Sequence, residues 1–115
     1  MKYDKIIRHH IPQIIEEQGG ECIVEQIDIM SQEGKEYLKK KLIEETAELV
    51  EAVSRADILE EIADVMEVLG AFCAQEGVDL GKIFTIGEAK CITRGDFNKG
   101  GKYVILKESN KAKDN

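Results

Sequence analysis

The hydrophobic positions in the middle of the chain recur with helical spacing. Between about residues 33 and 54 they fall four or seven positions apart, at Leu38, Leu42, Leu49 and Val53. A second helix is predicted from about residue 57 to 76, where apolar residues are denser, with Asp57 as its cap and Gly77 after its end. The short connection between these helices predicts that they pack antiparallel.

Weaker helical patterns flank this central pair. Residues 3–18 have helical spacing in their second half, where Pro12 fits the first turn and Gly19-Gly20 ends the segment. A third helix is predicted from Asp79, a capping residue, to about Thr93. Most of the chain is therefore expected to be helical.

Two short segments have the composition of strands. The segment ECIVEQIDI (21–29) is rich in Ile and Val with a rough alternation, and YVIL (103–106) follows a loop-like stretch at 94–102. We therefore expect an all-α fold with a small accessory β-element from residues 22–28 and 103–106. We also expect one domain at 1–108, followed by a polar tail at 109–115.

Composition narrows the function classes. Hydrophobic residues make up 43% of the 115 residues and charged residues 34%, as in globular proteins, and the net charge of −7 disfavours binding to bulk nucleic acid. The three cysteines have no CxxC spacing, which argues against a disulfide framework or a structural zinc site. The chain shows no apolar signal segment and no membrane-spanning run, so we expect a cytoplasmic protein without membrane contact.

One carboxylate of the first central helix lies among its hydrophobic positions. With Leu38 at zero and about 100° per residue, Glu45 falls at about 340°, inside the apolar stripe, and Glu48 lies one turn later at about 60° to its side. A buried carboxylate costs several kcal/mol, roughly, unless it is paired or bound. This position therefore requires a compensating charge.

The second central helix repeats the pattern. With Ile58 at zero, Glu61 falls at about 300°, between Val68 and Phe72, and Asp64 borders the same arc. In an antiparallel pair the four carboxylates Glu45, Glu48, Glu61 and Asp64 can converge and hold a divalent cation. Oxygen ligands without His or Cys favour Mg²⁺, Mn²⁺ or Ca²⁺ over zinc.

Other interpretations of the acidic residues stay open. Glutamates on helices are commonly solvated, and we interpret Glu16, Glu17, Glu51, Glu60 and Glu67 in this way. A single glutamate on an apolar stripe can also be a paired core residue. The whole cluster could instead bind arginines of a partner protein, which would make the chain a helical interaction module.

Spacing in the acidic pattern resembles a known signature. The run Glu44-Glu45-x-x-Glu48, followed after twelve residues by Glu61-x-x-Asp64, is similar to that of the all-α nucleoside triphosphate pyrophosphohydrolases. That superfamily includes MazG, phosphoribosyl-ATP pyrophosphohydrolase and the dimeric dUTP pyrophosphatases.

Both ends of the chain resemble one compact branch of phosphoribosyl-ATP pyrophosphohydrolase-like proteins. KIIRHHIPQII (5–15) looks like its KLVRDKIPEII opening, and Lys90, Arg94-Gly95 and Phe97 look like its K-x-x-x-R-G-x-F closing segment. The resemblance spans roughly residues 3–106. The chain departs from that branch at His9 and His10, which replace an acidic residue and a lysine, and we interpret neither histidine as a metal ligand.

The resemblance implies Mg²⁺-dependent hydrolysis of a nucleotide between its α- and β-phosphates, with Mn²⁺ as an alternative ion. Glu45, Glu48, Glu61 and Asp64 would then hold the metal, and Glu44 would orient or deprotonate the attacking water. Cations for the substrate phosphates would come from Lys5, Arg8, Lys90 and Arg94. The last two lie four positions apart and would share one helix face.

The helical pattern and the resemblance also lead to expectations about assembly and activity. The second central helix has an apolar arc too broad for a single partner helix, which indicates burial against another subunit, and superfamily members form dimers or tetramers. We expect a homo-oligomer that binds a nucleotide substrate. A non-catalytic protein that binds a nucleotide or a partner is the alternative.

Overall fold

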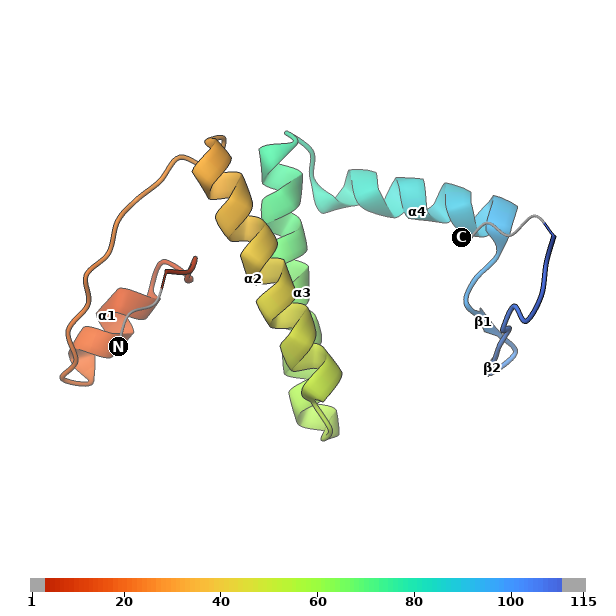
Figure 1. The fold of residues 1–115 in the computed structure, drawn as a ribbon, viewed down its shortest axis with the longest axis horizontal. Helices are drawn as coiled ribbons and strands as arrows, with labels where there is room; N and C mark the ends of the chain where they lie inside the picture. Colours follow the sequence, from red (N-terminus) through yellow and green to blue (C-terminus); the bar gives the residue numbers. More distant parts are fainter. Residues whose placement is uncertain (1–3, 111–115) are drawn as a thin grey trace. The chain divides into compact units, whose positions relative to one another are not determined.

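A computed structural model describes residues 4–110 of the chain. The chain divides into two compact units, Met1–Val78 and Asp79–Asn115. The described part contains the helices α1 (Ile11–Glu17), α2 (Gln32–Glu51), α3 (Arg55–Gln75) and α4 (Leu80–Arg94), and the short strands β1 (Asn98–Lys99) and β2 (Lys102–Tyr103) (Figure 1). The expected fold class, all-α with a small accessory β-element, is confirmed.

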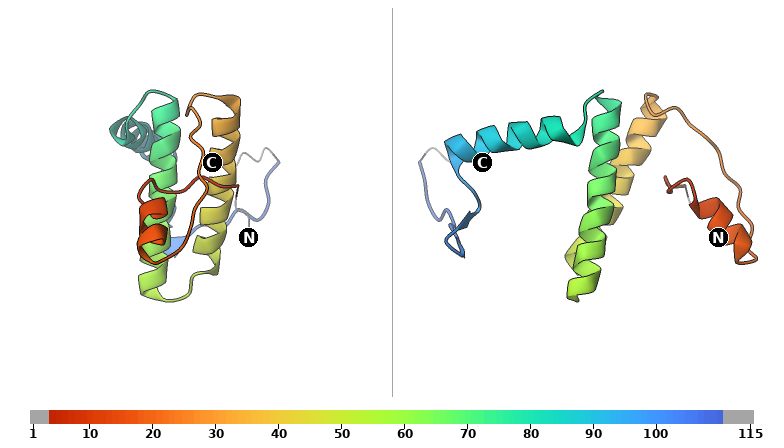
Figure 2. Two further views of the ribbon diagram at one scale, coloured as in Figure 1. Left: turned by 90° about the vertical axis from the view of Figure 1, so that its left-hand side faces the viewer. Right: turned by 180° about the vertical axis from the view of Figure 1, so that it is seen from behind.

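The first unit is built on α2 and α3, which lie side by side and antiparallel (Figures 1 and 2). The short link at residues 52–54 connects them. Their shared interface buries Leu38, Val68 and Cys73, which are 4%, 6% and 8% exposed. Many other apolar side chains of this unit stay exposed, so the helix pair alone encloses only a small core.

Serine side chains cap the N-terminal ends of both long helices. Ser31 accepts a hydrogen bond from the Gly34 backbone N–H at 2.9 Å and Ser54 accepts one from the Asp57 N–H at 3.1 Å. The prediction that Asp57 caps α3 was therefore wrong, because Asp57 lies in the first turn. Gly34 has a steric role, since a Cβ there would lie 2.5 Å from the Asp28 carbonyl oxygen.

The end of α2 also differs from the prediction. The helix stops at Glu51, and Ala52 is extended with φ −66° and ψ 137°. Val53, which was placed on the apolar stripe, lies beyond the helix and is 88% exposed. Periodicity alone cannot detect such an end, because the apolar spacing continues past the last helical residue.

The N-terminal segment contributes one short helix. α1 has Pro12 in its first turn, as predicted, and covers only the second half of the helical pattern. The strand predicted at 22–28 is not present among the described residues, where this stretch is irregular and pairs with no strand. Its Ile and Val side chains favour extended backbone, but a strand also needs a hydrogen-bonded neighbour. The Gln75 side chain donates to the Ile29 carbonyl at 3.2 Å and ties this stretch to α3.

The second unit consists of α4 and a β-hairpin. Asp79 caps α4 by accepting from the Lys82 N–H, as predicted, and Gly95 ends it with φ 81°. The hairpin pairs Asn98 with Tyr103 and Lys99 with Lys102. The strand predicted at 103–106 is correct only for its first residue. Of the predicted tail at 109–115, residues 111–115 lie outside the described part.

No helix in the described part is both long enough and apolar enough to cross a membrane.

Candidate metal centre

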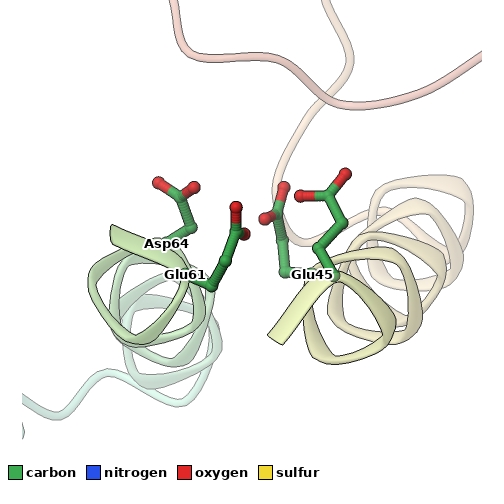
Figure 3. Close-up of side chains that lie close together, drawn as sticks. Glu45, Glu61 and Asp64 are labelled. Atoms are coloured by element: carbon green, nitrogen blue, oxygen red, sulfur yellow. The ribbon is translucent and has the colours of Figure 1, made fainter. Parts of the chain in front are cut away.

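Four carboxylates converge between the two long helices. Glu45 and Glu48 come from α2, and Glu61 and Asp64 come from α3, and one carboxylate oxygen of each lies within 4.8 Å of the others. Figure 3 shows Glu45, Glu61 and Asp64 pointing to the same side of the helix pair. The convergence expected from the helical pattern is present.

Burial is deepest at Glu45, which is 7% exposed. Its Oε2 atom and the Oε2 atom of Glu61 are both buried and have no hydrogen-bond partner. An unsatisfied buried carboxylate oxygen costs free energy, so such atoms commonly face a ligand. These two oxygens are the strongest sign that the cluster could bind a cation.

The local electrostatics agree with this interpretation. Desolvation by burial raises the pKa of Glu45, and the nearby charge of Glu48 raises it further. Hydrogen bonding and charge from Lys41 act in the opposite direction and lower that pKa. A divalent cation would remove the repulsion between the carboxylates and keep Glu45 ionised.

The dimensions of the cluster are compatible with a hard divalent cation. Oxygens on opposite sides of one Mg²⁺ ion are about 4.2 Å apart, and on opposite sides of Ca²⁺ about 4.6 to 5.2 Å apart. The 4.8 Å limit on the oxygen separations lies close to this range. The residues present therefore fit a hard divalent cation, and their spacing does not select one such ion.

Two cations from the N-terminal segment approach the cluster. Arg8 donates to Oδ1 of Asp64 at 2.9 Å and also lies 3.8 Å from Glu67. Lys5 lies 3.4 Å from Oε1 of Glu44. Both residues were predicted near the site from the resemblance of residues 5–15, and the structure brings Arg8 to a carboxylate of the cluster and Lys5 to the neighbouring Glu44.

Lys90 and Arg94 lie on α4 in the second unit, both exposed, four positions apart on one helix as predicted. Arg94 is the last residue of that helix. His9 and His10 are exposed beside Arg8, with ring centroids 4.1 Å apart and ring planes tilted by 40°.

The sequence analysis missed one residue of the site, Lys41. Its ammonium lies 3.4 Å from an oxygen of Glu44 and 3.4 Å from an oxygen of Glu45. A signal for it existed, because residues four apart on a helix are neighbours and Lys41 precedes Glu45 by four. Lys41 was not predicted as a site residue because it belongs to a run of three lysines at 39–41, and such runs are usually exposed to solvent.

Comparison with known proteins identifies the family of the chain. The family of phosphoribosyl-ATP pyrophosphohydrolase matches residues 24–90, more than half of the chain, and this range contains all four carboxylates of the cluster. No curated protein and no solved structure matches the chain. From the match over its central helices, we conclude that this chain belongs to the phosphoribosyl-ATP pyrophosphohydrolase family, whose members are pyrophosphohydrolases.

Proposed function

We propose that this protein is a Mg²⁺-dependent nucleotide pyrophosphohydrolase. It cleaves a nucleoside triphosphate or a related nucleotide between the α- and β-phosphates and releases a monophosphate and pyrophosphate. The observation that carries the proposal is the pair of buried oxygens without partners, on Glu45 and Glu61, inside a cluster of four carboxylates. Family membership supports the reaction class.

The acidic residues have distinct roles in this proposal. Glu45, Glu48, Glu61 and Asp64 hold the metal, which when bound supplies positive charge for the phosphate oxygens and increases the acidity of water. Mn²⁺ would serve in place of Mg²⁺. Glu44 lies beside Glu45 with its side chain 31% exposed, so it can reach solvent and orient the attacking water.

The cations position the substrate. Arg8 is 56% exposed although it contacts Asp64, so a phosphate oxygen can reach its guanidinium from the solvent side. Lys5 has a similar position beside Glu44, with 40% of its side chain exposed. We propose Lys90 and Arg94 as further phosphate ligands on the resemblance of the closing segment. Phosphoryl transfer depends on such positioning and charge neutralisation.

A homo-oligomer is part of the proposal. On α3 a stripe of exposed large apolar residues follows helical spacing and consists of Leu59, Ile62, Met66 and Leu69. It lies about 150° around the helix from the face that carries Glu61, Asp64 and Val68. A second subunit could therefore cover the stripe without covering the carboxylate cluster.

The test is release of pyrophosphate from a panel of canonical and modified nucleoside triphosphates and phosphoribosyl-ATP, with Mg²⁺ or Mn²⁺. EDTA should abolish the release. Glu61→Gln should lower kcat at least about a hundredfold, because it removes a charged ligand. The matched control is Glu60→Gln, which changes the adjacent, exposed glutamate of the same helix and should leave the rate unchanged.

The outcomes separate the alternatives. Metal-dependent turnover that Glu61→Gln abolishes and Glu60→Gln preserves would support the enzyme and rank its substrates. If no nucleotide is cleaved but Mg²⁺ still raises the melting temperature, the result points to a binding protein or to a substrate outside the panel. If Mg²⁺ has no effect on either measurement, the metal centre itself is wrong and the interaction module is favoured.

A further inference from the structure

Lys41 differs from the two lysines that precede it. Lys39 and Lys40 are exposed, and the Lys40 ammonium lies 5.5 Å from the centre of the Tyr37 ring. The Lys41 side chain is only 17% exposed and its ammonium contacts two adjacent glutamates, Glu44 and Glu45, each at 3.4 Å. A partly buried ammonium shared by two carboxylates is more than an ordinary surface ion pair.

The two carboxylate oxygens of Glu45 have different surroundings. Oε1 faces the ammonium of Lys41, while Oε2 is buried and has no partner. A carboxylate that is held at one oxygen has a restricted orientation, so its other oxygen keeps a defined direction. Lys41 therefore restrains a carboxylate that belongs to the four-carboxylate cluster and that still has one oxygen without a partner.

Helical position places Lys41 outside the cluster. It lies one turn before Glu45, whereas Glu48 lies one turn after it, so the ammonium and Glu48 approach Glu45 from opposite ends of its turn. The same ammonium also holds Glu44, which points about 100° away from Glu45.

We propose that Lys41 is a positioning residue of the metal centre, which orients Glu45 for metal binding and holds Glu44 beside it. The inference rests on the proposed function. Lys41 contacts neither metal nor substrate in this proposal and acts through the two glutamates. Its loss should therefore affect the metal and kcat more than it affects nucleotide binding.

Three variants test this role. Lys41→Met keeps most of the side-chain length and removes the charge, Lys41→Arg restores a cation, and Lys39→Met is the matched control at an exposed lysine of the same run. Mn²⁺ binding is measured by electron paramagnetic resonance, and kcat and KM are measured by pyrophosphate release with saturating Mn²⁺. Circular dichroism in EDTA checks that each variant is folded.

In Lys41→Met we expect Mn²⁺ affinity and kcat to fall about tenfold each, with KM for the nucleotide changed less than about twofold. Lys41→Arg should recover most of both losses, and Lys39→Met should match the unmodified protein. Unchanged or tighter Mn²⁺ binding in Lys41→Met would overturn the proposal and make Lys41 a counterion only. A rise in KM with kcat preserved would also overturn it, because the lysine would then contact substrate.

Failure of this inference differs from failure of the proposed function. If the unmodified protein binds Mn²⁺ but cleaves no nucleotide, the Mn²⁺ measurement alone still decides whether Lys41 orients Glu45. If the unmodified protein does not bind Mn²⁺, the metal centre and the role of Lys41 are both overturned.

Discussion

The guanidinium of Arg8 lies 2.9 Å from the carboxylate of Asp64, although 56 positions separate the two residues in the chain. Both side chains are substantially exposed, at 56% and 38%, so the ion pair contributes at most about 1 kcal/mol to stability. The ion pair matters mainly for where it holds the Arg8 guanidinium. It brings a cation from the N-terminal segment to the rim of the carboxylate cluster, where a substrate phosphate would arrive.

Replacing Arg8 should therefore weaken substrate binding without unfolding the protein. For Arg8→Gln we expect KM for the nucleotide to rise about tenfold, because one charge-assisted contact to phosphate is lost. The melting temperature and the Mn²⁺ affinity should change little. Steady-state kinetics and thermal denaturation measure these quantities.

Arg55→Gln is the control for Arg8, since Arg55 is an exposed arginine at the first position of α3. It should leave KM unchanged. A variant of Arg8 with normal KM but a much lower melting temperature would contradict the assignment and give Arg8 a structural role.

Glu45→Gln should stabilise the protein in EDTA at neutral pH. Burial, followed by the charge of Glu48, raises the pKa of Glu45 above its ordinary value of 4.5. The stability associated with the protonated carboxyl is fully present below pH 4.5 and is lost as pH rises through the higher folded-state pKa. At pH 7 the neutral glutamine removes this penalty, so the variant should melt at a higher temperature than the unmodified protein.

Thermal melts of Glu45→Gln and the unmodified protein from pH 4 to pH 8 test this sign. The advantage of the variant should shrink as pH approaches 4.5, and added Mg²⁺ should raise Tm only in the unmodified protein. Glu60→Gln, at an exposed position, should show neither effect. A variant that is less stable than the unmodified protein at pH 7 in EDTA would show that the Lys41 contact outweighs desolvation.

A charge in the exposed apolar stripe of α3 should disrupt the proposed assembly. Met66 is 37% exposed and lies between Ile62 and Leu69 on that stripe. Burial of a lysine in a subunit interface costs several kcal/mol, roughly, so Met66→Lys should lower the molar mass found by light scattering to that of one chain. Glu60→Lys, on a different face of α3, should leave the assembly intact. A single-chain mass for the unmodified protein would refute the homo-oligomer.

The pattern of residues predicted the part of the site that is local in sequence. Glu45 was expected inside the apolar stripe from its position relative to Leu38, and it is buried. Glu61 and Asp64 were expected beside it because two helices with a short connection pack antiparallel. These inferences needed only helical periodicity and the cost of burying charge.

Contacts between residues that are far apart in the sequence could not be predicted from the hydrophobic pattern alone. Nothing in the spacing of Lys5 or Arg8 indicates that they reach carboxylates 39 and 56 positions away, and only the resemblance of the opening segment pointed to them. The strand predicted at 22–28 was wrong for the opposite reason, since local preference cannot supply a pairing partner. The end of α2 at Glu51 was missed because a helix terminates through backbone geometry that apolar spacing does not record.

The short link of residues 52–54 between α2 and α3 affects which substitutions can alter the site. All four carboxylates lie between positions 45 and 64, so closing the loop that joins them costs little chain entropy and requires no distant segment. Arg8 and Lys5, in contrast, come from a separate stretch of sequence. We therefore expect substitutions near the N-terminus to change how substrate binds while the four carboxylates keep their positions.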